Sequence, residues 1–171
     1  MIVDHNHRYV FISVPKTASI SIQFSLGWGH DIPEPDLYHC GIADVLAKHP
    51  EAREFFKFAF VRNPWARLVS LYFDFTKKRV NQYSGLVRHD QPLLSEFKGF
   101  EDLCLRVHES PWASNVFFRS QTAQLSVDGK PAMDYYGRFE NLPAEFETIC
   151  GKIGIPTPPL QKWNEGVYEK D

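Results

Sequence analysis

The stretch VPKTASIS at residues 14–21 carries residue types that can bind an anion. It follows the apolar run from Tyr9 to Val14, which is short and ends at a proline, as expected for a buried strand. A helix that starts directly after a strand presents N–H groups without partners and the positive end of its dipole. With Lys16 beside such a turn, the stretch predicts a phosphate-binding site.

This stretch differs from the Walker A loop, GxxxxGK(S/T), because it has no glycine and its lysine precedes the turn. From Ala18 to Leu26 apolar residues alternate with polar ones, which by period alone favours a strand. We predict a helix from about Ser19, since Thr17 and Ser19 offer N-cap chemistry and a phosphate site requires a helix N-terminus. On this stretch alone, a plain strand–turn–helix with an exposed lysine remains an alternative.

A second group of residues follows another predicted strand, Phe56 to Val61. Arg62 lies at its carboxyl end, where open α/β sheets bind ligands, and Pro64 suits the first turn of a helix. Ser70 lies about two helical turns beyond Arg62. Arg62 can instead pair with a carboxylate, and Ser70 can face a neighbouring helix. Two anion sites on successive strand-to-helix turns suggest a ligand phosphorylated at two separated positions.

The remaining patterns predict the elements that must position these groups. Helices are expected over residues 42–49, 100–108 and 112–120, and a turn at 127–130 leads to a third strand near 133–139. A further helix starts at Leu142 and is capped by Asn141. Strands that alternate with helices predict one α/β domain over residues 1–171, with a central parallel sheet and helices on both faces.

Composition narrows the classes of partner. The chain has 171 residues and a formal net charge of −2, so no overall basic field attracts nucleic acid. No apolar run approaches the roughly 20 residues that cross a bilayer, and the start of the chain lacks the regions of a signal peptide. We therefore expect a cytoplasmic protein without a membrane partner, unless an upstream segment is missing from the sequence.

Cysteines and N-terminal histidines give no sign of a metal site in the sequence. Cys40, Cys104 and Cys150 are widely spaced and form no CxxC pair, so free thiols are expected in place of zinc or disulfides. His5 and His7 lie in a polar leader and are expected to be solvated.

Taken in order, VPKTASIS, FAFVRNPWARLVSLY and GRFENLPAEFETIC resemble the sulfotransferase superfamily that uses 3′-phosphoadenosine 5′-phosphosulfate (PAPS). Within it, the carbohydrate-type enzymes, including heparan sulfate 2-O-sulfotransferases, are most similar. The resemblance spans about Tyr9 to Pro159. It implies a three-layer, P-loop-NTPase-like fold and sulfuryl transfer from PAPS to a hydroxyl acceptor, expected to be a carbohydrate. The product would be adenosine 3′,5′-bisphosphate (PAP), with no metal required.

The resemblance also assigns expected roles to single residues. Lys16 matches the lysine that stabilises charge on the leaving phosphate, and Arg62 with Ser70 matches the pair that holds the 3′-phosphate. The 5′-phosphate loop would be lined by Pro15, Lys16, Thr17, Ala18, Ser19, Ile20 and Ser21.

The acceptor hydroxyl also needs a base, and histidine is the usual choice near neutral pH. His39, in LYHCGIADVL, is the expected base because this stretch resembles the YHGH stretch of the 2-O-sulfotransferases, with Gly41 at the second histidine position. His108 is the next choice, and Glu or Asp can also serve. The basic residues Lys77, Lys78, Arg79 and Arg88 can form a lip for an anionic sugar, although a charge run in a loop is usually just solvated. The resemblance places acceptor-side residues at Trp112, Phe117, Phe118, Arg119 and Gln121, although such an aromatic stripe more often belongs to the core. A buried ion pair is expected for Arg138.

Three departures from the family pattern keep other functions open. Ile20 stands where the family usually has Thr, and Ala18 stands where Gly is common. Family members commonly continue beyond the position of Asp171 through a further helix, so a short or a truncated member is expected. The alternatives are a non-catalytic PAP-binding module and a small P-loop kinase, the latter disfavoured by the lack of Walker A and of a Mg²⁺-binding Asp after a strand.

Overall fold

A computed structural model of the chain describes residues 1–29, 37, 39–76, 79–80, 87–88 and 96–161. These residues belong to two compact units. The first comprises Met1–Asn63 and Arg119–Trp163, and the second comprises Pro64–Phe118 and Asn164–Asp171. Each unit is described by itself below.

A four-stranded sheet forms the centre of the first unit, in the order β1 (Ile2–Asp4), β2 (Tyr9–Ile12), β3 (Phe56–Val61) and β8 (Tyr135–Arg138). β2, β3 and β8 are mutually parallel, which confirms the three predicted strands. β1 runs antiparallel to β2, so the sheet is mixed and not wholly parallel. This fourth strand was not predicted.

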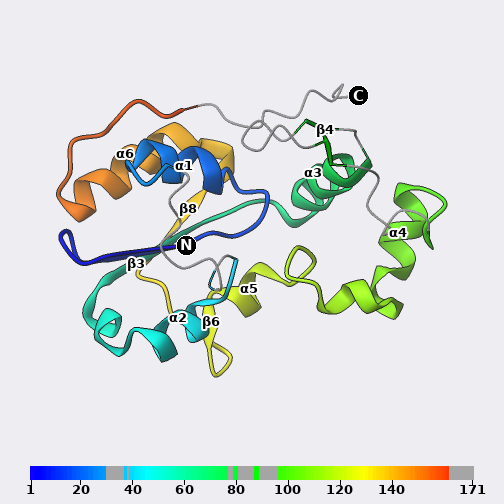
Figure 1. The fold of residues 1–171 in the computed structure, drawn as a ribbon, viewed down its shortest axis with the longest axis horizontal. Helices are drawn as coiled ribbons and strands as arrows, with labels where there is room; N and C mark the ends of the chain where they lie inside the picture. The colour runs from blue at the N-terminus through cyan, green and yellow to red at the C-terminus, as the bar shows by residue number, and fades with distance from the viewer. Residues whose placement is uncertain (30–36, 38, 77–78, 81–86, 89–95, 162–171) are drawn as a thin grey trace. The chain divides into compact units, whose positions relative to one another are not determined.

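Both faces of this sheet are covered by helices, as the sequence predicts (Figure 1). Successive residues of β2 point to opposite faces, as in any strand. Tyr9 and Phe11 pack with α1 (Ser19–Ser25) and α6 (Leu142–Ile153) in one core. Val10 and Ile12 pack with α2 (Ile42–Lys48) and the 3₁₀ helix η2 (Pro50–Glu54) in the other. The first unit is thus a three-layer α/β structure of the P-loop-NTPase-like kind.

Three short elements lead into β8. α5 (Gln121–Gln124) is followed by a hairpin of β6 (Ser126–Val127) and β7 (Lys130–Pro131). Asp128 and Gly129 both have positive φ, 50° and 73°, as a type I′ hairpin turn requires. This confirms the predicted turn. After β8, the 3₁₀ helix η6 (Phe139–Asn141) leads into α6, which starts at Leu142 as predicted. Asn141 is its N-cap residue but makes no side-chain cap bond, so the predicted capping by this side chain is wrong.

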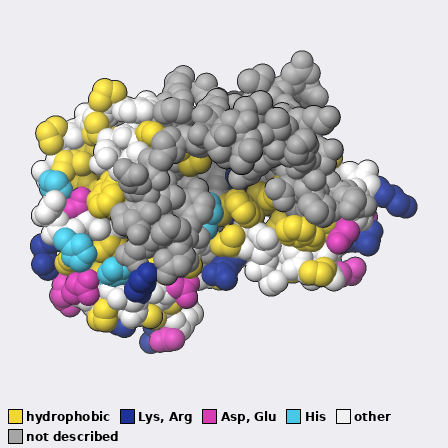
Figure 2. All heavy atoms as spheres, viewed as in Figure 1, with side chains coloured by type: hydrophobic (Ala, Val, Ile, Leu, Met, Phe, Trp, Pro, Cys, Tyr) yellow, Lys and Arg dark blue, Asp and Glu magenta, His cyan; other side chains and the backbone are white. Residues whose placement is uncertain are grey.

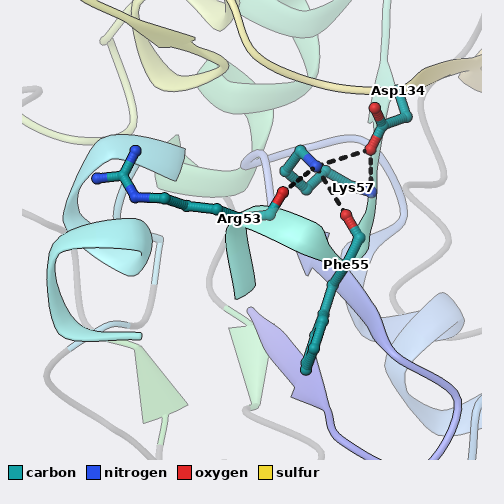
Figure 3. Close-up of polar contacts among 4 residues, drawn as sticks. All are labelled: Arg53, Phe55, Lys57 and Asp134. Atoms are coloured by element: carbon teal, nitrogen blue, oxygen red, sulfur yellow. Dashed lines mark hydrogen bonds and ion pairs between the residues drawn. The ribbon is translucent and has the colours of Figure 1, made fainter. Parts of the chain in front are cut away.

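Lys57 connects the amino ends of the neighbouring strands β3 and β8 (Figure 3). Its ammonium group lies 2.9 Å from the Asp134 carboxylate and donates to the carbonyl oxygens of Phe55 (2.7 Å) and Arg53 (3.1 Å). The main-chain N–H of Lys57 donates to the same carboxylate at 2.7 Å, and the N–H of Asp134 donates to the Lys57 carbonyl at 2.8 Å. One side chain therefore binds the end of η2 and the residue preceding β8.

The second unit contains α3 (Pro64–Thr76), the strand pair β4 (Arg79–Val80) and β5 (Val87–Arg88), and α4 (Phe100–Arg106). Two 3₁₀ helices follow, η4 (Val107–Glu109) and η5 (Pro111–Ser114). Its core consists of Leu71, Phe75, Phe97 and Leu103. The first two of these residues lie on α3, the helix expected to start at Pro64.

The predicted helix over residues 112–120 is wrong. Only the 3₁₀ helix η5 forms there, and Ser110 Oγ caps its start by accepting from the N–H of Trp112 at 3.2 Å. The chain turns extended at Asn115 (ψ 139°), whose Oδ1 accepts from the N–H of Phe117 at 3.0 Å and so competes with a continuing helix. Across the described part of the chain, no helix has the length and apolar character needed to span a membrane.

Candidate functional site

The loop between β2 and α1 contains two non-glycine residues with left-handed backbone, Lys16 (φ 68°) and Ala18 (φ 62°). Ala18 is the N-cap of α1 and makes no side-chain cap bond, so the predicted capping by Thr17 or Ser19 is wrong. The Thr17 hydroxyl instead donates to the carbonyl of Val14 at 2.9 Å and closes the turn. The helix itself starts at Ser19, as predicted. Glycine adopts left-handed backbone more readily than alanine, so a glycine would also suit position 18.

Main-chain N–H groups of this loop are available to an anion. Among the hydrogen bonds of the described residues, none has an N–H group from Thr17 to Ile20 as its donor. Successive N–H groups in a turn with left-handed residues form a concave anion site of the nest type. The side chains of Ser19 and Ser21 are buried within the same turn, whereas Ile20 is partly exposed and offers no hydroxyl.

Arg62, which belongs to the second predicted motif, contacts this loop. Its Nη1 donates to the carbonyl oxygen of Lys16 at 3.2 Å, although the two residues are 46 positions apart in the chain. The guanidinium carbon also lies 4.2 Å from the centre of the Phe139 ring, a cation–π contact. Phe139 belongs to GRFENLPAEFETIC, so residues of all three motifs meet in the first unit.

Two neighbouring side chains hold the backbone around Arg62. The side-chain amide of Gln121 accepts from the N–H of Arg62 at 2.9 Å and donates to its carbonyl at 2.7 Å. Glu140 accepts from the N–H of Asn63 at 2.7 Å. This hydrogen bond, together with the charges of Arg62 and Arg138, holds the pKa of Glu140 below its ordinary value. Arg138 itself is exposed, so the expected buried ion pair is wrong.

His39 is buried and lies against the end of β2. Its Nδ1 is 2.8 Å from the carbonyl oxygen of Ser13. A carbonyl can only accept, so Nδ1 carries the proton and the second ring nitrogen, Nε2, is the one able to take up another. Gln23 of α1 donates to the Ser13 hydroxyl at 3.0 Å. Ser13 thus connects His39 and α1 to the strand that leads into Lys16.

Gly41 packs closely against α5. A Cβ atom at this position would lie 3.0 Å from the carbonyl oxygen of Gln124, so a larger residue would need a small shift of this neighbour. Gln124 in turn donates to the carbonyl of His39 at 3.3 Å. The contact leaves little room for a side chain at the position where the resemblance places a second histidine.

Arg119 belongs to the first unit, and the remaining predicted residues lie in the second. Ser70 is buried on α3, near Arg67, whose guanidinium donates to the carbonyl of Phe117 at 3.0 Å and whose pKa burial lowers. His108 is exposed beside Glu109. Trp112, Phe117 and Phe118 pack against the core of the second unit.

The predicted basic residues of this region are only partly described. Lys77 and Lys78 lie outside the described residues, and Arg79 and Arg88 are paired across β4 and β5. Cys40, Cys104 and Cys150 are free thiols, as expected.

The sheet, the nest-like loop and the arginine after β3 define a class, namely an α/β domain with groups suited to anion binding at the carboxyl ends of its parallel strands. Comparison with protein families then identifies the group. A model of the Sulfotransferase family matches residues 39–171, well over half of the sequence, and the chain belongs to this family. The match begins at His39, so VPKTASIS precedes it. Comparisons with curated proteins and with solved structures gave no significant match.

Proposed function

We propose that this sulfotransferase moves a sulfuryl group from PAPS to a hydroxyl group of a carbohydrate. Membership of the family supports sulfuryl transfer in general. The observation that carries the PAPS proposal is the contact of Arg62 with the carbonyl of Lys16, which unites the two anion-binding motifs. A donor with phosphate at both its 3′ and 5′ positions matches two such groups.

In this proposal the loop from Pro15 to Ser21 binds the 5′-phosphosulfate through its main-chain N–H groups. The Lys16 ammonium neutralises the charge that grows on the leaving phosphate as the sulfur–oxygen bond breaks. Sulfuryl transfer resembles phosphoryl transfer in its loose, in-line transition state, so positioning and electrostatic stabilisation dominate. Arg62 of the first unit binds the 3′-phosphate. The same role expected for Ser70, which belongs to the second unit, stays a prediction from the resemblance.

His39 acts as the general base through Nε2. The bond from Nδ1 to Ser13 fixes both the tautomer and the ring orientation, as second partners of catalytic histidines commonly do. The proton leaves the acceptor hydroxyl as its oxygen bonds to sulfur. The carbohydrate nature of the acceptor rests on the resemblance of the three motifs to carbohydrate-type enzymes.

Calorimetric titration tests the donor site. PAP, 5′-AMP and ATP are compared on the native chain, on Arg62→Ala and on a matched control, Arg53→Ala, whose side chain is exposed on η2. A charge-assisted hydrogen bond contributes about 1.5–3 kcal/mol, so PAP should bind at least about tenfold more tightly than AMP. Arg62→Ala should remove this difference and Arg53→Ala should retain it.

Three results would contradict parts of the proposal. Equal affinity for PAP and AMP would exclude the two-phosphate donor site. Mg²⁺-dependent ATP binding stronger than PAP binding would indicate a kinase. Tight PAP binding, combined with no transfer from ³⁵S-labelled PAPS to any member of a panel of glycans, would indicate a non-catalytic binding module.

A further inference from the structure

A second cluster of chemically active side chains lies near the amino ends of the parallel strands. The ligand atoms of His5, His49 and Glu51 all lie within 4.8 Å of one another. His5 precedes β2, and Glu51 lies in η2, which precedes β3, whereas Lys16 and Arg62 follow these two parallel strands. The cluster is therefore separated from the proposed donor site by the length of the strands.

The fold fixes the places of all three residues. The His5 ring meets the ring of Phe55 edge-on, with ring centres 5.5 Å apart at 84°, and Phe55 is buried. His49 ends α2 and begins η2, where Pro50 and the bond from the N–H of Ala52 to the His49 carbonyl (3.0 Å) fix the turn. His49 Nδ1 lies 3.4 Å from Glu51 Oε1. Two of the three potential ligands are thus already in contact.

The hairpin that carries His5 is also anchored to β3. The N–H of Phe56 donates to the carbonyl of Arg8 at 2.9 Å, and the Arg8 guanidinium lies 4.8 Å from the centre of the Phe55 ring. Figure 2 shows histidine side chains close to acidic ones on the face drawn. The side chain of His5 is exposed, as the sequence predicts. It nevertheless lies beside two further ligand-type side chains that are more than 40 positions away.

Two imidazoles and one carboxylate form a donor set that suits Zn²⁺ and similar ions, and a water molecule completes such sites. Zinc–ligand bonds of about 2.0–2.2 Å place tetrahedral ligand atoms about 3.4 Å apart. The separation between His49 and Glu51 already equals this value, and the exposed side chains of His5 and Glu51 can rotate to close the rest. We propose that His5, His49 and Glu51 bind a divalent transition-metal ion of the Zn²⁺ type.

The position of the site indicates a structural role. A bound ion would connect the turn between β1 and β2 to η2. It would therefore link the antiparallel strand pair to the segment that precedes β3. Because the proposed donor loop lies at the opposite, carboxyl ends of these strands, metal binding should raise thermal stability without changing affinity for PAP. A Mg²⁺ ion, which prefers six oxygen ligands, should not bind here.

Zinc titration by calorimetry, paired with thermal melting, tests the site on the full chain after treatment with a chelator. We expect one Zn²⁺ per chain and a rise in Tm of several degrees at a free zinc concentration about 100-fold above Kd. His5→Ala and Glu51→Gln should each weaken binding at least about tenfold and abolish the rise in Tm. His7→Ala is the matched control, since it removes a histidine from the same turn that lies outside the cluster.

Circular dichroism of the metal-free variants separates loss of a ligand from loss of the fold. Glu51→Gln preserves side-chain shape at an exposed position, so it stays informative if His5→Ala unfolds. Absence of stoichiometric zinc binding by the native chain would overturn the proposal. Unchanged zinc affinity in Glu51→Gln and in a folded His5→Ala variant would overturn it as well, because the ion would then bind elsewhere.

Discussion

The guanidinium of Arg62 donates a hydrogen bond to the main-chain carbonyl of Lys16, at 3.2 Å. The left-handed backbone of Lys16 belongs to the same turn as the N–H groups from Thr17 to Ile20. One arginine after β3 therefore supports the loop after β2 and adds a positive charge beside it. A substitution at Arg62 is therefore expected to disturb the backbone of Lys16, and a change in that backbone is expected to disturb the position of the Arg62 side chain.

Lys16→Met should slow sulfuryl transfer much more than it weakens PAP binding, because the ammonium group acts mainly on charge that develops as the bond breaks. Loss of one such electrostatic contact typically costs about 100- to 1,000-fold in kcat. Radiometric transfer assays and PAP calorimetry on the same variant measure the two effects. Lys130→Met, at the exposed β6–β7 turn, serves as the control. Equal losses in kcat and in PAP affinity would contradict a role confined to the transition state.

His39→Gln should lower kcat by about 100-fold or more while PAP affinity stays within about threefold, since the base acts on the acceptor and not on the donor. The pH dependence of kcat should also lose its limb on the acid side. His108→Gln is the control, because His108 is the other histidine considered and is exposed in the second unit. A normal rate for His39→Gln, or a large loss for His108→Gln, would move the base elsewhere.

Gln121→Ala should destabilise the first unit by about 1–3 kcal/mol, because it leaves the N–H and carbonyl groups of Arg62 without the partners that the amide provides. Chemical denaturation measures this change in the free energy of unfolding. PAP affinity should fall as well, since the position of Arg62 is no longer fixed. Thr122→Ala, an exposed neighbour on α5, should change neither quantity. If Gln121→Ala matches it in both, the amide does not hold Arg62.

Glu140 should make stability depend on pH in the acid range. Its pKa is lowered in the folded chain, chiefly by the N–H of Asn63, so the unfolded chain binds its proton more readily. The stabilisation is therefore fully present above the ordinary pKa of 4.5 and is lost as the pH falls through the lower folded value. Denaturation curves between pH 6 and pH 3 should show a shallower pH dependence for Glu140→Gln than for the native chain. Parallel curves would refute this linkage.

Lys57→Met should lower the free energy of unfolding by about 1–3 kcal/mol, because the carboxylate of Asp134 and two carbonyl groups lose a charged donor. The methionine keeps the apolar stem and so isolates the loss of the ammonium group. Lys130→Met, on the exposed strand β7, is the control. A double variant with Asp134→Asn should be less than additive, since the two groups interact. Strict additivity would show that the ion pair contributes nothing.

Strands and helices with strong local patterns were predictable from sequence. β3 occupies the predicted residues Phe56–Val61, because its apolar run is buried between two layers. β1 escaped prediction, since its three residues are too few to show a period and depend on pairing with β2. The start of α1 was predicted correctly but for the wrong reason. The left-handed Ala18, and not a side-chain cap, begins the helix.

Contacts between distant positions were not predictable. The bonds from Gln121 to Arg62 join residues 59 positions apart and depend on where α5 meets the end of β3. The cluster of His5, His49 and Glu51 is likewise created by the pairing of β2 with β3. Residue types indicated which groups can do chemistry, whereas the register of the sheet decides which of them meet.

The insertion of the second unit between β3 and β8 has a consequence for biosynthesis. A ribosome must translate all of Pro64–Phe118 after β3 before the strand that pairs with it, Tyr135–Arg138, exists. Pairing of strands so far apart in the chain is slow, because the loop must close before the contacts between the strands form. Until then the aromatic face of β3, Phe58 and Phe60, lacks the cover that α6 later gives it. Nascent chains that end before β8 and α6 would expose the apolar face of β3, and chaperones that bind apolar segments would recognise it.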